Sequence, residues 1–212
     1  MHWVAVDHAL AALDRHGATD AWYILLDAVD GDVHDAVRDS GHPDAVRLLA
    51  ALPLTPPPIP VYQLKISLYG GLWRRVLVPE NLTLGHLHGV ISDLFGWGDD
   101  HLHVFSTAKR RYADPFHRLE ECGDEYTYRI NRALPSPHSK ITYVYDLGDT
   151  WRHEILLEKV RDDEVTHPVC VAGRGDNPIE HYDPEYPEDP VPFDQDAINK
   201  QLATRFVRAD VA

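Results

Sequence analysis

The sequence predicts an α+β fold, in which helices pack on an antiparallel or mixed β-sheet in the order ββαββ…ββ…α, preceded by a small helical appendage. The hydrophobic spacing is helical as far as residue 52 and alternates with a period of two from residue 61 onwards. Between these parts, residues 53–60 contain five prolines in eight positions, which is typical of a stiff linker. We therefore expect a helical appendage over 1–52, a linker over 53–60 and the main domain over 61–212.

The appendage is predicted to contain four short helices. In the first, Val6, Ala9, Leu10 and Leu13 follow a helical spacing, and Gly17 is expected to end it. The other three are expected over 22–29, 33–38 and 43–52. No pattern in this part of the chain points to chemistry.

The main domain is predicted to open with strands over 61–69 and 73–78, joined by a glycine turn. An apolar stripe then predicts a helix between Thr83, which can cap its start, and Gly96, which can end it. The turn at 147–150 is typical of a hairpin. The remaining expected elements are strands over 101–107, 110–112, 141–146 and 151–160, irregular stretches over 113–139 and 173–193, and a final helix that begins at Asp194.

Charge argues against a nucleic-acid-binding surface. The 212 residues carry a formal net charge of −14, and the acidic excess lies in the two flanks, while residues 61–160 are nearly neutral. Proteins that bind nucleic acids usually present a basic face. We interpret the two short basic runs, Arg74-Arg75 and Lys109-Arg110-Arg111, as solvated turns.

The expected location is the cytoplasm. No stretch approaches the roughly 18 apolar residues of a membrane span, and Met1-His2-Trp3-Val4 does not begin like a signal peptide. Cys122 and Cys170 are too few for a disulfide framework or a cysteine-based zinc site. These features predict a reduced, soluble protein without a membrane partner.

Histidines supply a candidate metal site. His101 and His103 share one face of a predicted strand, and Asp149 and His153 share one face of the predicted hairpin. If the two strands are close, three imidazoles and one carboxylate would suit zinc, iron or manganese. The alternative is that these histidines and Trp151 form a polar, hydrogen-bonded wall of the core.

Four residues are candidate ligand-binding residues. They are Trp97, just after the predicted helix, and Asp149, Trp151 and Arg152 of the hairpin. Core packing of the two tryptophans and turn capping by the aspartate are the simpler interpretations.

Two strings of residues carry a family resemblance: Leu72-Trp73-Arg74-Arg75-Val76-Leu77-Val78-Pro79 and Tyr143-Val144-Tyr145-Asp146-Leu147-Gly148-Asp149-Thr150-Trp151-Arg152-His153-Glu154. With Gly96-Trp97 and His101-Leu102-His103 at matching spacing, residues 60–160 resemble the plasmid pRiA4b ORF-3-like family, and 168–202 match more weakly. The resemblance implies an α+β fold of the type seen in archaeal members, and no established activity.

Some members of that family travel with insertion sequences and are labelled as resolvases, which this sequence does not support. A tyrosine recombinase needs a His-x-x-Arg, which this sequence does not contain. A serine recombinase needs a nucleophilic serine close to the N-terminus, whereas the first serine here is Ser40. The family usually carries a cysteine-containing segment where this sequence reads Asn177-Pro178-Ile179-Glu180-His181-Tyr182. Pro178 and Glu180 persist, but the missing cysteines put a cysteine-dependent metal or redox role in doubt.

The leading hypothesis is a ligand- or partner-binding accessory domain of plasmid or mobile-element type, whose partner is an unidentified protein or small molecule. The alternative is a metal-dependent small-molecule enzyme that uses His101, His103, His153 and Asp149 with a divalent zinc, iron or manganese ion. Nucleic-acid processing rests on the family label alone and is opposed by the charge.

Overall fold

The computed structural model describes residues 3–29, 31–98, 100–182, 184–185 and 189–209, with side chains as far as residue 206 in the last helix. The chain forms two compact units, residues 1–58 and 59–212. The division falls within the proline-rich segment. Among the described residues, no helix combines the length and the apolar character that crossing a membrane requires.

The smaller unit is built from four helices, as predicted. They are α1 (Trp3–His16), α2 (Ala18–Leu26), α3 (Val33–Asp39) and α4 (Ala45–Ala51). Gly17, with φ near 97°, separates α1 from α2 without a Cβ penalty. The side chain of Asp32 accepts a hydrogen bond from the amide of Asp35 and so caps α3. Apolar side chains of all four helices, among them Val6, Tyr23, Val37 and Leu48, form one buried core.

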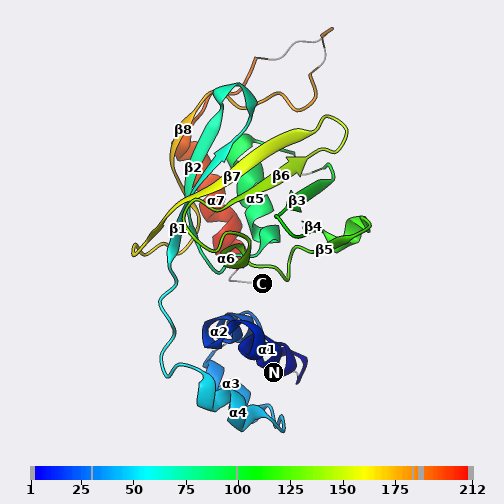
Figure 1. Ribbon diagram of the computed structural model, residues 1–212. Helices are drawn as coiled ribbons and strands as arrows, with labels where there is room; N and C mark the ends of the chain where they lie inside the picture. Colours follow the sequence, from blue (N-terminus) through cyan, green and yellow to red (C-terminus); the bar gives the residue numbers. More distant parts are fainter. Residues whose placement is uncertain (1–2, 30, 99, 183, 186–188, 210–212) are drawn as a thin grey trace. The chain divides into compact units, whose positions relative to one another are not determined.

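The larger unit contains an eight-stranded sheet with the order β5-β4-β3-β6-β7-β1-β2-β8 (Figure 1). All neighbouring strands are antiparallel except β4 and β5, which are parallel. The predicted α+β class is therefore confirmed. The strands are β1 (Val61–Ser67), β2 (Trp73–Pro79), β3 (His103–Ser106), β4 (Arg111–Ala113), β5 (Cys122–Asp124), β6 (Lys140–Tyr145), β7 (Trp151–Arg161) and β8 (Val169–Arg174).

Two long helices, α5 (Leu84–Phe95) and α7 (Gln195–Ala209), pack on one face of this sheet (Figure 1). The predicted start and end of α5 are confirmed: Thr83 caps it through a capping box with His86, and Gly96 ends it with a φ of 76°. Short elements complete the unit: the 3-10 turns η1 (Tyr69–Gly71) and η2 (Pro115–His117), and α6 (Ile130–Ala133).

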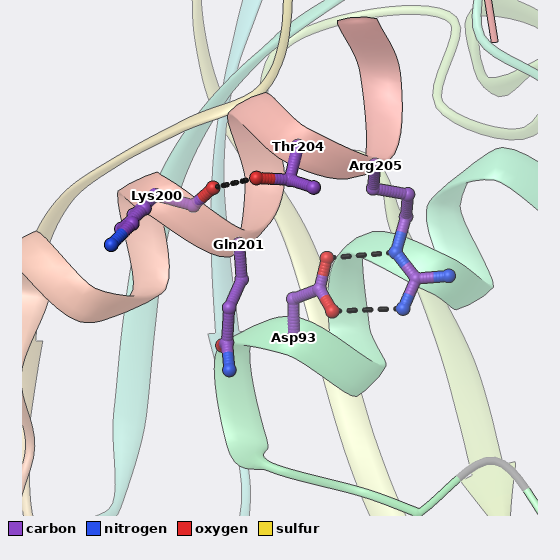
Figure 2. Close-up of a pocket in the computed structure, with 5 residues that line it drawn as sticks. All are labelled: Asp93, Lys200, Gln201, Thr204 and Arg205. Carbon is purple, nitrogen blue, oxygen red and sulfur yellow. Dashed lines mark hydrogen bonds and ion pairs between the residues drawn. The ribbon is translucent and has the colours of Figure 1, made fainter. Parts of the chain in front are cut away.

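An ion pair joins α5 and α7 at the protein surface. Arg205 of α7 donates two hydrogen bonds to Asp93 of α5, at 2.7 and 2.8 Å (Figure 2). Lys200, Gln201 and Thr204 line the same surface groove of about 450 Å³. Because its carboxylate and guanidinium satisfy each other, we interpret this groove as part of the helix packing.

Two sequence expectations are wrong. Val169–Arg174 is a strand, where a loop was expected to begin at residue 173, and Cys170 lies buried within it. Arg74 and Arg75 do not lie in a solvated turn but in strand β2, between β1 and β8. In contrast, Lys109 and Arg110 are exposed between β3 and β4, as expected.

Arg74 is completely buried beneath α5, and each of its three guanidinium nitrogens donates at least one hydrogen bond. Its guanidinium donates to the carbonyls of Leu94 at 3.1 Å and Arg174 at 3.0 Å, and to the side-chain oxygen of Asn177 at 2.8 Å. A further bond to the carbonyl of Trp73 and the ring of Phe193, 4.4 Å away, complete its surroundings. One side chain thus joins β2, the end of α5 and the segment after β8.

We expect Arg74→Met to lower the free energy of unfolding by about 3 kcal/mol or more, because it leaves several buried carbonyl groups without donors. The matched variant is Arg75→Met on the same strand, whose partner Glu158 lies on the partly exposed face of the sheet. That change should cost less than about 1 kcal/mol. Urea unfolding of the full chain measures both, and equal losses would contradict the structural role of Arg74.

Candidate metal centre and adjoining cavity

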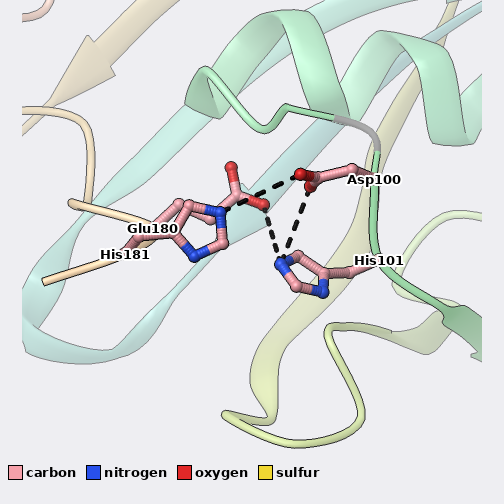
Figure 3. A group of neighbouring side chains, drawn as sticks. All are labelled: Asp100, His101, Glu180 and His181. Carbon is pink, nitrogen blue, oxygen red and sulfur yellow. Dashed lines mark ion pairs between the residues drawn. The ribbon is translucent and has the colours of Figure 1, made fainter.

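Two carboxylates and two imidazoles converge where the segment before β3 meets the segment after β8 (Figure 3). The four residues, here called the tetrad, are Asp100, His101, Glu180 and His181. One ligand atom from each lies within 4.8 Å of all the others. His101 Nε2 lies 3.6 Å from Asp100 Oδ1 and 3.8 Å from Glu180 Oε1, and His181 Nε2 lies 4.0 Å from Asp100 Oδ2.

Glu180 is held in place through both of its oxygens. The hydroxyl of Tyr145, in β6, donates to Oε1 at 2.5 Å, and the amide of Gly98 donates to Oε2 at 2.7 Å. Burial, together with the adjacent Glu180, raises the pKa of Tyr145 well above its ordinary value, so the hydroxyl keeps the proton that it donates. The same hydroxyl lies 3.3 Å from Asp100 Oδ1, so one tyrosine orients both tetrad carboxylates.

Beside the tetrad lies a cavity of about 230 Å³ that shares two residues with it. The described residues that line this cavity are all polar: His88, Asp100, His101, His103, Asp114, His117 and Tyr126. The cavity and the tetrad therefore form one continuous site at this end of the sheet.

A buried carboxylate lies behind one wall of the cavity. Glu125 is fully buried, and its two oxygens lie 3.0 and 2.9 Å from Nε2 of His103. The ring of His103 is stacked on that of His88, with the centroids 3.6 Å apart and the planes at 8°. His88 in turn pairs through Nδ1 with the hydroxyl of Tyr143, 2.7 Å away. These contacts fix the two imidazoles of the wall.

Three imidazole nitrogens at this site have no hydrogen-bond partner within the part of the chain that the structure describes. They are Nε2 of His101, Nδ1 of His103 and Nδ1 of His117. Buried polar groups are normally satisfied. Three such atoms around one cavity therefore indicate a place for something that the protein itself does not supply.

The structure does not bring together the four metal ligands predicted from the sequence. His101 belongs to the tetrad and His103 to the cavity wall, but Asp149 is exposed in the β6–β7 turn. β6 lies between β3 and β7, so that His103 and Trp151 both pair with Tyr145 and do not face each other. In addition, His101 lies before the start of β3, where the alternation of a strand does not apply.

His153 is a core residue whose two ring nitrogens are both engaged. Nε2 accepts a hydrogen bond from the indole of Trp97 at 3.3 Å, and Nδ1 pairs with the carbonyl of Trp151 at 2.9 Å. No lone pair remains for a metal ion in this arrangement. This agrees with the alternative interpretation, in which the histidines form a hydrogen-bonded wall of the core.

The four candidate ligand-binding residues lie outside the cavity. Trp97 is buried against Tyr145 and Trp151, with ring centroids 5.1 and 5.0 Å away. Trp151 is half-buried and stacks with the exposed ring of Tyr69. Arg152 is exposed and points to Thr142, while Asp149 donates its amide to the Asp146 side chain within the turn.

Sequence reasoning missed most residues of the site. Glu125 and His117 lie in the stretch expected to be irregular, where no spacing rule groups side chains. For Glu180 a signal existed, because Pro178 and Glu180 persist where the family's cysteines are missing. His88, which also lines the cavity, is buried there, whereas His86 on the same helix caps the start of α5.

The fold and the site define an α+β protein whose sheet supports a carboxylate–imidazole cluster beside a histidine-lined cavity. The chain belongs to the plasmid pRiA4b ORF-3-like protein family, whose model matches residues 60–187.

Two relatives extend this comparison. "Uncharacterized protein y4hQ" of Sinorhizobium fredii (strain NBRC 101917 / NGR234) is 31% identical over 91 residues, which are 41% of this chain and 45% of the relative. The alignment thus spans less than half of that relative. The crystal structure of MM3350, a protein of unknown function from Methanosarcina mazei Go1, is 31% identical with a TM-score of 0.49, covering 54% of this chain and 69% of that one. Neither description states an activity, so no specific biochemical function follows from them.

Burial lowers the pKa of His153 to about 4, although its contacts with backbone carbonyls oppose this shift. Between about pH 6.5 and 4 the unfolded chain therefore binds a proton that the folded chain does not. We expect this to remove about 3 kcal/mol of stability as the pH falls through that window, and to change little at lower pH.

His153→Gln should reduce by about that amount the difference between the unfolding free energies at pH 7 and pH 4. His8→Gln, an exposed histidine of α1, should leave the difference unchanged. Urea unfolding at the two pH values measures both variants. An equal pH dependence in wild type and His153→Gln would contradict a neutral, buried His153.

Proposed function

We propose that this protein binds a divalent transition-metal ion through Asp100, His101, Glu180 and His181. The observation that carries the proposal is the convergence of their four ligand atoms within 4.8 Å, around a glutamate whose two oxygens are already fixed. Ligand atoms that bind one ion at about 2.0–2.2 Å lie about 3–4 Å from one another. The measured separations of 3.6, 3.8 and 4.0 Å fall in this range.

The donor set favours a particular group of metals. Imidazole nitrogen suits zinc, iron and other first-row ions, whereas carboxylate oxygen also suits manganese. The two carboxylates neutralise the charge of a divalent ion, so the complete centre is close to neutral. Tyr145 and Gly98 act as the outer hydrogen-bond partners that hold a ligating carboxylate in position.

The tetrad supports the metal-dependent small-molecule function that was the alternative from the sequence, with His101 as the one shared ligand. An ion that takes six ligands keeps two positions for a water or a small molecule beyond the four that the tetrad supplies. The adjoining cavity, which shares Asp100 and His101, is where such a molecule would lie.

The broader setting stays a prediction. The family's plasmid-derived description supports an accessory role on plasmids or mobile elements. The free cysteines Cys122 and Cys170 support a cytoplasmic location. The partner is either a protein or a small molecule. We expect a small molecule first, because the cavity can hold one.

Isothermal titration of the EDTA-stripped protein with zinc chloride tests the centre. We expect about one zinc ion per chain, and at least about 100-fold weaker binding in Glu180→Gln and in His181→Ala, because each removes one ligand. His181 is largely exposed and Glu180→Gln preserves shape, so both variants should fold.

Two matched variants serve as controls. Asp149→Asn removes a carboxylate of the set predicted from the sequence, and His8→Ala removes an exposed imidazole; both should bind zinc like the wild type. Absence of zinc binding by the wild type would contradict the proposal, as would unchanged binding in both tetrad variants.

Tyr145→Phe tests the positioning of Glu180. The change removes one hydroxyl and keeps the ring, so the stoichiometry should stay at about one while the affinity for zinc falls about 10- to 100-fold. Tyr69→Phe, at an exposed ring outside the site, is the matched control. If both variants bind zinc with equal affinity, Tyr145 does not position the ligand.

A further inference from the structure

We propose that the cavity lined by His88, His103, His117 and Asp114 is the ligand chamber of the metal centre, and that it takes a small, hydrogen-bond-donating molecule that is neutral or cationic. This rests on the proposed function for the ion at one end of the cavity. The chemical class of the ligand follows from the cavity wall alone.

The wall offers nitrogen atoms that lack partners. His103 is almost completely buried, and its Nδ1 has no hydrogen-bond partner in the described part of the chain. The ring of His117 lies 6.0 Å from that of His103, nearly perpendicular to it, and its Nδ1 is likewise buried without a partner. Leaving such groups unsatisfied costs about 1–3 kcal/mol each, and a bound molecule would recover this free energy.

The acceptors of the cavity wall indicate the polarity of the ligand. The carboxylates of Asp100 and Asp114 line the cavity and accept hydrogen bonds. The buried carboxylate of Glu125 engages Nε2 of His103, which leaves Nδ1 as the ring atom that faces a ligand. A ligand that donates hydrogen bonds satisfies the lining carboxylates.

Charge excludes anions from the same space. Asp100 and Asp114 line the cavity and Glu125 lies behind it, whereas no lysine or arginine is among the lining residues that the structure describes. A divalent ion on the tetrad offsets Asp100 and Glu180 but leaves Asp114 and Glu125. A carboxylate or phosphate ligand would meet repulsion there, while an alcohol or an amine would find acceptors on several sides.

The volume limits the size of the ligand. About 230 Å³ is smaller than the 300–1,000 Å³ typical of pockets for drug-sized molecules. Among the described residues no aliphatic side chain lines the cavity, so a hydrophobic ligand gains little there. Tyr126, whose hydroxyl donates to Asp114 at 3.1 Å, is half-exposed and places this end of the cavity at the protein surface. A short polyol or amine satisfies all of these conditions.

Three four-carbon probes of similar length test this class: erythritol (neutral), 1,4-diaminobutane (cationic) and succinate (anionic). Saturation-transfer NMR on the EDTA-treated full chain should detect the first two and not succinate. His117→Phe, which keeps a ring but removes the unpartnered ring nitrogen, should weaken their binding about three- to tenfold. His8→Phe is the matched control and should bind like the wild type.

Several results would overturn the proposal: preferential binding of succinate, no binding of either donor probe, or equal binding by wild type and His117→Phe. These experiments use metal-free protein, so their outcome does not depend on the result of the zinc titration. The link to the metal is tested by measuring the affinity for erythritol in metal-free and in zinc-loaded protein. Tighter binding than in the metal-free chain is expected, and an unchanged affinity would show that the chamber does not serve the ion.

Discussion

The buried guanidinium of Arg74 is the constraint on which the rest of the larger unit depends. It joins three parts of the fold: the start of β2, the last turn of α5 and the segment after β8. Both segments that carry the tetrad start from one of its contacts. Leu94 precedes Asp100 and His101, and Asn177 precedes Glu180 and His181. The side chain of Arg74, which packs in the core, therefore also sets the position of the site.

The site is an extension of polar groups that already run through the core. Tyr143, Tyr145, His103 and His153 lie on the helix-covered face of the sheet, where apolar side chains would pack at a lower desolvation cost. Each of these groups has a partner, which reduces the cost of its burial. One ring atom of this set, Nδ1 of His103, lacks a hydrogen-bond partner in the described part of the chain, as does Nδ1 of the neighbouring His117. Both residues line the cavity, where a ligand can reach them.

Most of the long elements could be predicted from the sequence, whereas the site could not, for a physical reason. Thr83 and Gly96 bound α5 through local backbone chemistry, and the alternation in β1 and β2 reflects local burial, so both could be predicted. Arg74 was misjudged because charge alone predicts exposure, and only its acceptors on three distant segments explain its burial. The predicted set of His101, His103, His153 and Asp149 depended on two strands being neighbours, and β6 lies between them. Strand order is set by the whole sheet and cannot be inferred from the spacing in each strand.

The residues that build and support the tetrad lie far apart in the sequence. This distance has a consequence for folding. The amide of Gly98 and the side chain of Glu180 are 82 residues apart, and Arg74 and Asn177 are 103 residues apart. Closing such loops costs conformational entropy, which only the completed sheet and its docked helices can offset. The tetrad therefore forms among the last contacts of the unit, after β8 has paired with β2. A chain that is only partly folded lacks this constellation, so the tetrad is a marker of the finished molecule.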